Sequence, residues 1–197
     1  MAQINHITII VSGMLLAILL VTACLTDFRD RRISNKLVVI GTLTGIGLHI
    51  LFPKGAGLFS TAAGSLGTMN ALYGCAAGLG LMMPFYLLRA MGAGDVKLMA
   101  MIGAFLGPES VLDAVLMTCL SGGILAIVVA VWKGVFRRTI ANMHLITTHT
   151  IMNALSGHRP PIGTLSSSTV KLPYALAITA GTVLQIILAR DGHAIFS

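Results

Sequence analysis

Long apolar runs constrain this chain more than any other feature. Residues 7–26, 37–52, 66–88, 90–106, 111–132 and 172–189 are predominantly hydrophobic. Each has roughly the length with which a helix crosses a bilayer. In lipid such a run must form a helix, because its backbone groups find no water to bind. The sequence therefore predicts an all-α, polytopic membrane helical bundle of about six transmembrane helices.

Composition and charge agree with this prediction. The chain is 56% hydrophobic and 10% charged, with a net charge of +7, whereas soluble domains are about 25% charged. The basic residues lie in short loops between apolar runs, so membrane topology explains them better than nucleic-acid binding. We expect membrane lipid as a partner, no nucleic acid, and one membrane-embedded domain over residues 1–197. The first apolar run lacks a basic segment before it, which predicts a retained span.

The loops alternate in charge. Of the 13 Lys and Arg residues, ten lie in the loops after the first, third or fifth apolar run, Lys97 lies near the start of the fourth run on the same side, and the exceptions are Lys54 and Arg190. The positive-inside rule places the basic loops in the cytoplasm. Residues 137–171, in the last of these loops, are too polar to span and predict a cytoplasmic amphipathic helix and loop inserted into the domain. The spacing of its His144, His149 and His158 does not favour a metal site.

The chain contains six acidic residues, of which three lie on the outer side and are expected to be solvated: Glu109, Asp113 and Asp191. On the cytoplasmic side, Asp30 lies between two arginines and is also expected to be solvated. Asp27 directly follows the first apolar run. A carboxylate at membrane depth is costly and therefore a candidate functional group, although a solvated loop acid is the alternative.

Asp95 lies in the segment Gly92-Ala93-Gly94-Asp95-Val96-Lys97, at the start of the fourth apolar run. Gly92 and Gly94 would let the backbone bend sharply or let another segment approach closely. The alternative is that Asp95 simply caps a helix.

Asp27 and Asp95 are predicted to lie at the same membrane face. Two carboxylates that share a site cannot both ionise easily, so one keeps a proton. One can then activate water while the other protonates the leaving amide nitrogen, and no metal or cofactor is needed. The sequence contains neither Gly-x-Ser-x-Gly nor His-Glu-x-x-His. The pair is therefore a candidate aspartyl-protease dyad.

These residues resemble the type IV prepilin peptidases. Asp27 followed by Ile33-Ser34-Asn35 is similar to that family's first motif, and Gly92-x-Gly94-Asp95-x-Lys97 is similar to its second. The resemblance implies removal of the N-terminal leader from prepilins or pilin-like proteins at the cytoplasmic face of a bacterial inner membrane. Asp27 and Asp95 would be catalytic, with Gly92, Gly94, Lys97 and Asn35 supporting the motifs.

Two departures refine the resemblance. Ser34 replaces the usual proline, which affects the loop shape, and Ser34 or Asn35 can still cap the second span. The paired Cys-x-x-Cys zinc motif of the bifunctional members does not occur, so no metal and no N-methyltransferase activity are expected. The short form resembles the peptidases of Flp/Tad-type pili, which implies a small Flp-like pilin as substrate. Lys97 could orient Asp95, but we favour its extension to the lipid headgroups.

Other functions stay open. A proton-coupled small membrane transporter would show internal repeats and acids near the midplane. Another Gly-x-Gly-Asp intramembrane protease, of the presenilin type, would carry tyrosine before the first acid, where this chain has Thr26. An inactive assembly factor could retain the same fold. No residue pattern specifies the oligomeric state or the individual prepilin.

Overall fold

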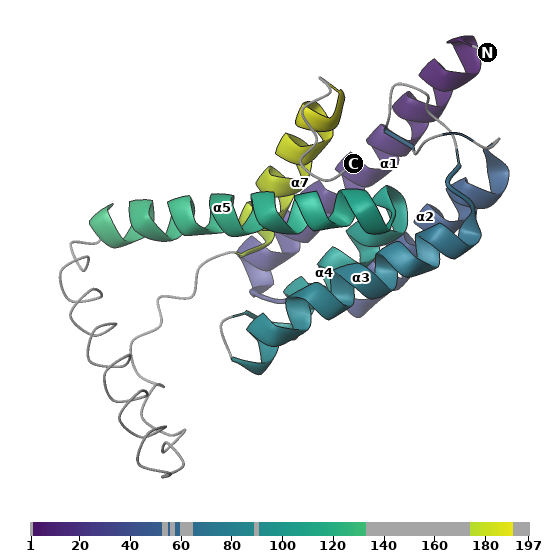
Figure 1. Ribbon diagram of the computed structural model, residues 1–197. Helices are drawn as coiled ribbons and strands as arrows, with labels where there is room; N and C mark the ends of the chain where they lie inside the picture. The colour runs from purple at the N-terminus through teal and green to yellow at the C-terminus, as the bar shows by residue number, and fades with distance from the viewer. Residues whose placement is uncertain are drawn as a thin grey trace, which may run out of the picture. The chain divides into compact units, whose positions relative to one another are not determined.

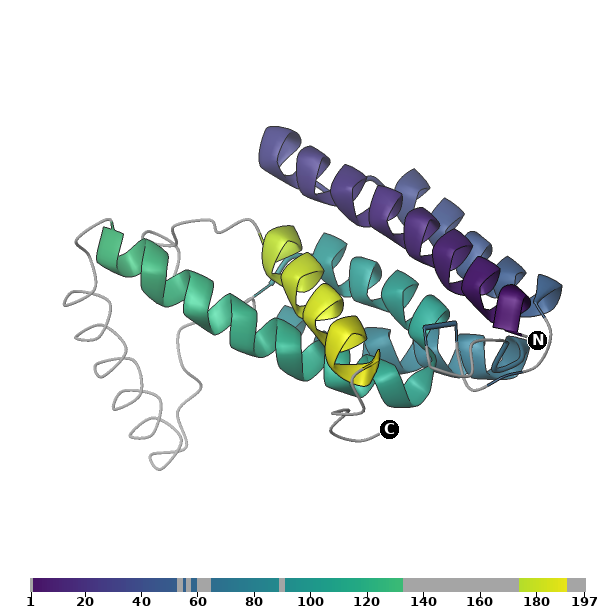
Figure 2. The same cartoon turned by 90° about the horizontal axis from the view of Figure 1, so that it is seen from above.

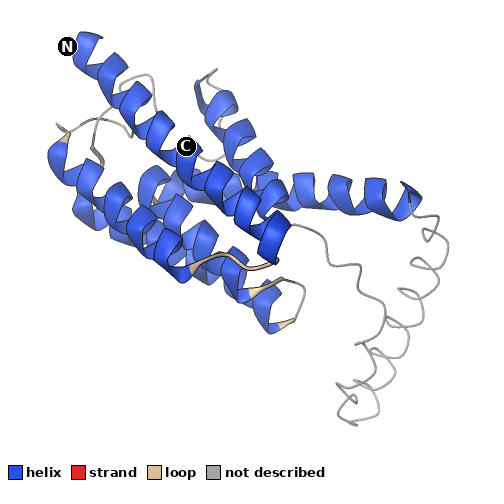
Figure 3. Ribbon diagram, turned by 180° about the vertical axis from the view of Figure 1, so that it is seen from behind, coloured by secondary structure: helices blue, strands red, loops and turns tan. Residues whose placement is uncertain are grey.

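The computed structural model describes residues 2–52, 55, 58–59, 65–88, 91–132 and 174–190. Its helices are α1 (Ala2–Asp30), α2 (Asn35–Leu51), α3 (Thr68–Leu87), α4 (Ala93–Leu106), α5 (Pro108–Trp132) and α7 (Tyr174–Arg190). Over these ranges the chain forms helices and no strand (Figures 1 and 3). Each predicted apolar run overlaps one helix, so the all-α helical prediction is confirmed.

The chain divides into two compact units. The first comprises residues 1–122 and 173–197, and the second comprises residues 123–172. Within the second unit only the last turns of α5 are described, and the predicted insertion over residues 137–171 lies outside the described residues. The first unit, called the core unit below, contains both candidate carboxylates.

Helix α4 forms the centre of the core unit. From Asp95 to Leu106 every residue except Lys97 is buried, and α4 contacts α1, α2, α3 and α7. A Cβ atom at Gly74 or Gly78 of α3 would collide with backbone carbonyl oxygens of α4. The Gly-x-x-x-Gly pair therefore lets two backbones pack closely within this chain.

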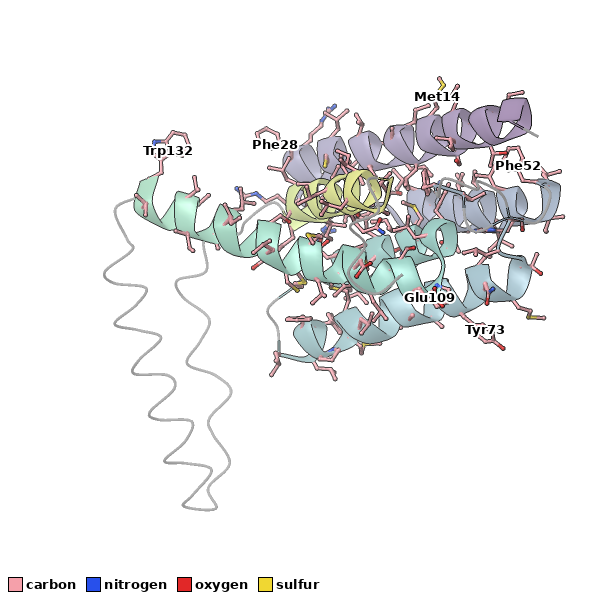
Figure 4. The ribbon with its side chains drawn as sticks, turned by 45° about the horizontal axis from the view of Figure 1, so that its top comes forward. Met14, Phe28, Phe52, Tyr73, Glu109 and Trp132 are labelled. Atoms are coloured by element: carbon pink, nitrogen blue, oxygen red, sulfur yellow. The ribbon has the colours of Figure 1, made fainter. Side chains whose placement is uncertain are left out.

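The outer face of α1 is apolar and its inner face carries polar groups. Thr8 and Ser12 are buried, and the Ser12 hydroxyl donates to the Thr8 carbonyl oxygen at 2.6 Å. Exposed apolar side chains recur every three or four residues along the other face: Ile7, Ile10, Val11, Met14, Ile18, Val21, Leu25 and Phe28. Figure 4 shows Met14 and Phe28 projecting from this outer face. Such a stripe suits contact with lipid rather than water.

The described helices differ in length. Only α1 and α5, among the described helices, are long and apolar enough to cross a membrane by length and composition, and α2 and α7 are shorter apolar helices. With 14 residues, α4 is about 21 Å long, less than the roughly 30 Å hydrocarbon core. Because α4 is buried by its neighbours, this short helix does not need to meet lipid along its whole length.

A buried histidine lies at the C-terminal end of α4, called the far end below. His49 of α2 is 3% exposed. Its Nδ1 accepts from the Leu66 N–H at 3.2 Å, so its Nε2, 3.3 Å from the Phe105 carbonyl oxygen, carries the proton and donates. This neutral ring links α2, the segment before α3, and the last turn of α4.

One expectation about the acidic residues is wrong. Glu109 is exposed, as predicted (Figure 4), but Asp113 is only 2% exposed. Helix α5 begins at Pro108, so Asp113 lies more than a turn inside the helix. It lies among the buried residues Val111, Ala114 and Val115. Asp191 is outside the described residues.

Candidate active site

Asp27 lies in the last turn of α1, four residues from the point where the chain turns. Its Oδ2 accepts from the Ala175 N–H at 3.3 Å. Ala175 is the second residue of α7, and the N–H groups of a first helical turn have no partner within their own helix. The half-buried Asp27 carboxylate therefore provides an acceptor at the positive end of α7.

Asp95 lies in the first turn of α4 and is 7% exposed. Its Oδ2 accepts from the Gly92 N–H at 3.0 Å, while Gly92 itself occupies the N-cap position. The simple helix-cap alternative is thus partly correct, because the Asp95 side chain reaches back to the helix start. Glycine has no side chain to return the bond, so this is one half of a capping box.

The two carboxylates belong to one cluster. The charge of Asp27 acts on Asp95, and the charge of Asp95 acts on the Tyr174 hydroxyl. The helices that carry these three groups, α1, α4 and α7, contact one another, and Figures 1 and 2 show α7 running beside α1. Helix packing thus brings together two acids that are distant in sequence, and it adds the start of α7. Asp30, by contrast, is exposed as expected.

The two motif glycines differ in their surroundings. A Cβ at Gly94 would lie 3.2 Å from the Ile33 Cβ, whereas one at Gly92 would lie 3.3 Å from Oδ2 of Asp95. Gly92 has a φ of −80°, a value open to any residue. Close approach of another segment, one of the two roles expected for these glycines, therefore applies to Gly94.

Lys97 and Asn35 are partners. The Lys97 ammonium donates to Asn35 Oδ1 at 3.0 Å, and both side chains are exposed. Sequence reasoning marked both residues but did not pair them, and it assigned Lys97 either to Asp95 or to the headgroups. Asn35 is the first residue of α2, and Ser34 holds the N-cap position without a side-chain cap bond.

Two contributors were missed from the sequence. Ile33 packs on Gly94, and Ala175 binds Asp27. The Ala175 contribution is a backbone N–H, so no residue type could signal it. Ile33 belongs to the first motif, but only its packing reveals its role.

Within the part of the chain that the structure describes, no group of three or more His, Cys, Asp or Glu residues could hold a metal ion. His144, His149 and His158 lie outside the described residues. The pair of carboxylates with its helix-start donors is the chemical feature that the described residues offer.

Comparison with known proteins gives one match. A sequence model of the Type IV leader peptidase family matches residues 14–127, more than half of the chain. The matched range contains both Asp27 and Asp95, while Ala175 lies beyond it. No curated protein and no solved structure gave a match. The chain belongs to the type IV leader peptidase family, and is a membrane protease of that type.

Proposed function

We propose that this protease removes the N-terminal leader of prepilins or pilin-like proteins, with Asp27 and Asp95 as its catalytic dyad. The observation that carries the proposal is that α1, α4 and α7 pack against one another, with the Asp27 carboxylate bonded to the start of α7 and Asp95 buried in the first turn of α4. Both acids also lie within the range that matches the leader peptidase family.

The dyad can hydrolyse a peptide bond without a covalent intermediate. In the proposed mechanism the two carboxyl groups share one proton, which belongs to the pair rather than to one residue. The ionised carboxylate takes a proton from the attacking water, and the protonated one donates to the leaving nitrogen. Hydrogen bonds from the Ala175 and Gly92 N–H groups orient the two carboxyl groups for this exchange.

The position of Asp27 along α1 suits a substrate that is itself anchored in the membrane. The exposed apolar stripe of α1 ends at Phe28, which is 82% exposed, and four exposed charged residues follow it: Arg29, Asp30, Arg31 and Arg32. The dyad thus lies where α1 passes from lipid-facing to water-facing residues. A leader joined to an apolar helix would present its scissile bond at this level.

The sidedness and the substrate follow from the charge pattern and the resemblance. The positive-inside rule places the loop after α1, and hence the dyad, on the cytoplasmic face. We assign the protein to the inner membrane of a bacterium, as a multi-pass protein. The resemblance to the short peptidases of Flp/Tad-type pili favours a small Flp-like pilin as the protein that is cut.

The test is co-expression with candidate prepilins, followed by measurement of leader removal on a gel. Asp27→Asn and Asp95→Asn should each abolish processing while the protein stays in the membrane. Asp30→Asn is the matched control, because Asp30 is an exposed acid in the same segment, and it should process normally. Normal processing by either dyad variant would refute the assignment.

A further inference from the structure

A short connector joins α1 to α2 and lies against the first turn of α4. It consists of residues 31–34, and it begins with Arg31 in the left-handed region at a φ of 50°. The Arg31 N–H donates to the carbonyl oxygen of Asp27 at 2.9 Å. The start of the connector is therefore bonded to the backbone of a dyad residue.

The connector reaches α4 at two points. Ile33 packs on Gly94, and Asn35, the first residue after the connector, accepts from Lys97. Ser34 between them is extended, with a φ of −66° and a ψ of 129°, and the residues on both sides of it contact α4. Gly94 and Lys97 are three residues apart on a helix and share a face.

The two contact points enclose Asp95 in sequence. Gly94 precedes it and Lys97 follows it by two residues, so the face that meets the connector is adjacent to Asp95. Few residues therefore connect Asp95 with Asp27. The start of α4 contacts Ile33 and Asn35, and Arg31 joins the connector to the end of α1.

We propose that these two contacts form a clasp, defined as Ile33 on Gly94 together with Asn35 bonded to Lys97, that sets the spacing of the dyad. Ile33, Asn35 and Lys97 are then positioning residues that act through Asp27 and Asp95 without touching substrate. The catalytic consequence rests on the proposed function, whereas the geometric one does not. A Cβ at Gly94 would lie 3.2 Å from the Ile33 Cβ, so a larger residue there would displace Ile33 by a few tenths of an ångström.

The geometric test measures a distance between two spin labels. The labels are attached at Phe28→Cys and Ala93→Cys, which are exposed positions beside the two acids, in a background where Cys24, Cys75 and Cys119 are alanine. Lys97→Met and Asn35→Ala should each shift or broaden the distance distribution. Lys97→Arg, which keeps the donor, and the exchange Asn35→Lys with Lys97→Asn should restore it.

A second label pair serves as the control. Leu43 of α2 and Tyr73 of α3 are exposed and lie away from the clasp in sequence, and Figure 4 shows Tyr73 on the outer side of α3. Labels at Leu43→Cys and Tyr73→Cys should give the same distribution in every variant. An unchanged distribution at the dyad pair would overturn the clasp. An equal shift at both pairs would also overturn it, because the bond would then support the fold in general.

The catalytic test uses the same variants without labels. Lys97→Met should lower kcat for leader removal by about three- to tenfold, the equivalent of one lost hydrogen bond, with KM nearly unchanged and kcat restored in Lys97→Arg. A fall in binding with kcat intact would contradict the positioning role. If the distance shifts as expected but the unsubstituted protein cuts no prepilin, the proposed function fails and the clasp stands.

Discussion

The two ends of α4 both meet a turn with a left-handed residue and both bury a titratable side chain. At the far end the left-handed residue is Gly107, with a φ of 85°, and His49 has a partner for each ring nitrogen. At the near end the left-handed residue is Arg31, and buried Asp95 is close to a second carboxylate.

The difference separates an end that stabilises the fold from the end that we propose to be catalytic. Glycine adopts positive φ without a steric penalty, whereas arginine does not. A satisfied neutral histidine stabilises the fold, whereas two neighbouring carboxylates oppose each other's ionisation. Proteins keep such departures from local rules mainly at sites where function requires them. These departures at the near end of α4 agree with the proposed active site.

The largest effect on stability is expected where the backbones of α3 and α4 touch. A Cβ at Gly74 would collide with the Gly103 carbonyl and with Gly107. Gly74→Val should lower the free energy of unfolding by about 3 kcal/mol, because backbone cannot move aside as a side chain can. The measurement is unfolding in mixed detergent micelles. Gly80→Val is the control, since a Cβ at Gly80 meets nothing within 4 Å, and equal losses would refute the packing argument.

The second prediction contrasts the two buried titratable groups. His49→Leu leaves the Leu66 N–H and the Phe105 carbonyl without a partner, so the free energy of unfolding should fall by about 2 kcal/mol. Asp95→Asn keeps an acceptor for the Gly92 N–H and removes a neighbouring like charge. Its free energy of unfolding should change by less than about 1 kcal/mol.

Activity should show the opposite order. The folded His49→Leu protein should still remove the leader at a temperature well below its unfolding transition, while Asp95→Asn should not. Unfolding curves and gel-based cleavage of the same preparations provide both quantities. A stable but inactive His49→Leu variant would mean that the far end of α4 is also needed for activity, and the two ends would then not differ in function.

The sequence predicted the helices and the two acids, but it did not predict which faces meet. Each helix follows from an apolar run whose length suits the bilayer. In lipid, however, both faces of a helix can be apolar, so the hydrophobic period does not indicate the buried side. The inward Thr8 and Ser12 of α1, and buried Asp113 of α5, are examples.

For the candidate site too, the residue types could be predicted from the sequence, whereas the contacts between helices could not. Asp27 and Asp95 stood out because charge is rare in this chain and because both lie in recognisable motifs. The pairing of Asn35 with Lys97, 62 residues apart, depends on how α2 and α4 pack. The backbone donor from Ala175 depends on the position of α7. Neither contact leaves a local pattern in the sequence.

The smallest expected effect concerns the strained turn at the near end. Arg31 holds a φ of 50°, a region that asparagine tolerates better than arginine. Arg31→Asn should therefore raise the free energy of unfolding by about 0.5 kcal/mol. Arg32→Asn removes the same charge from the neighbouring exposed residue, and among the described residues other than glycine only Arg31 has a positive φ. Arg32→Asn should give no gain. If the two variants are equally stable in detergent unfolding, the left-handed turn costs nothing at this position. The near end of α4 would then differ from the far end only in its carboxylates and not in backbone strain.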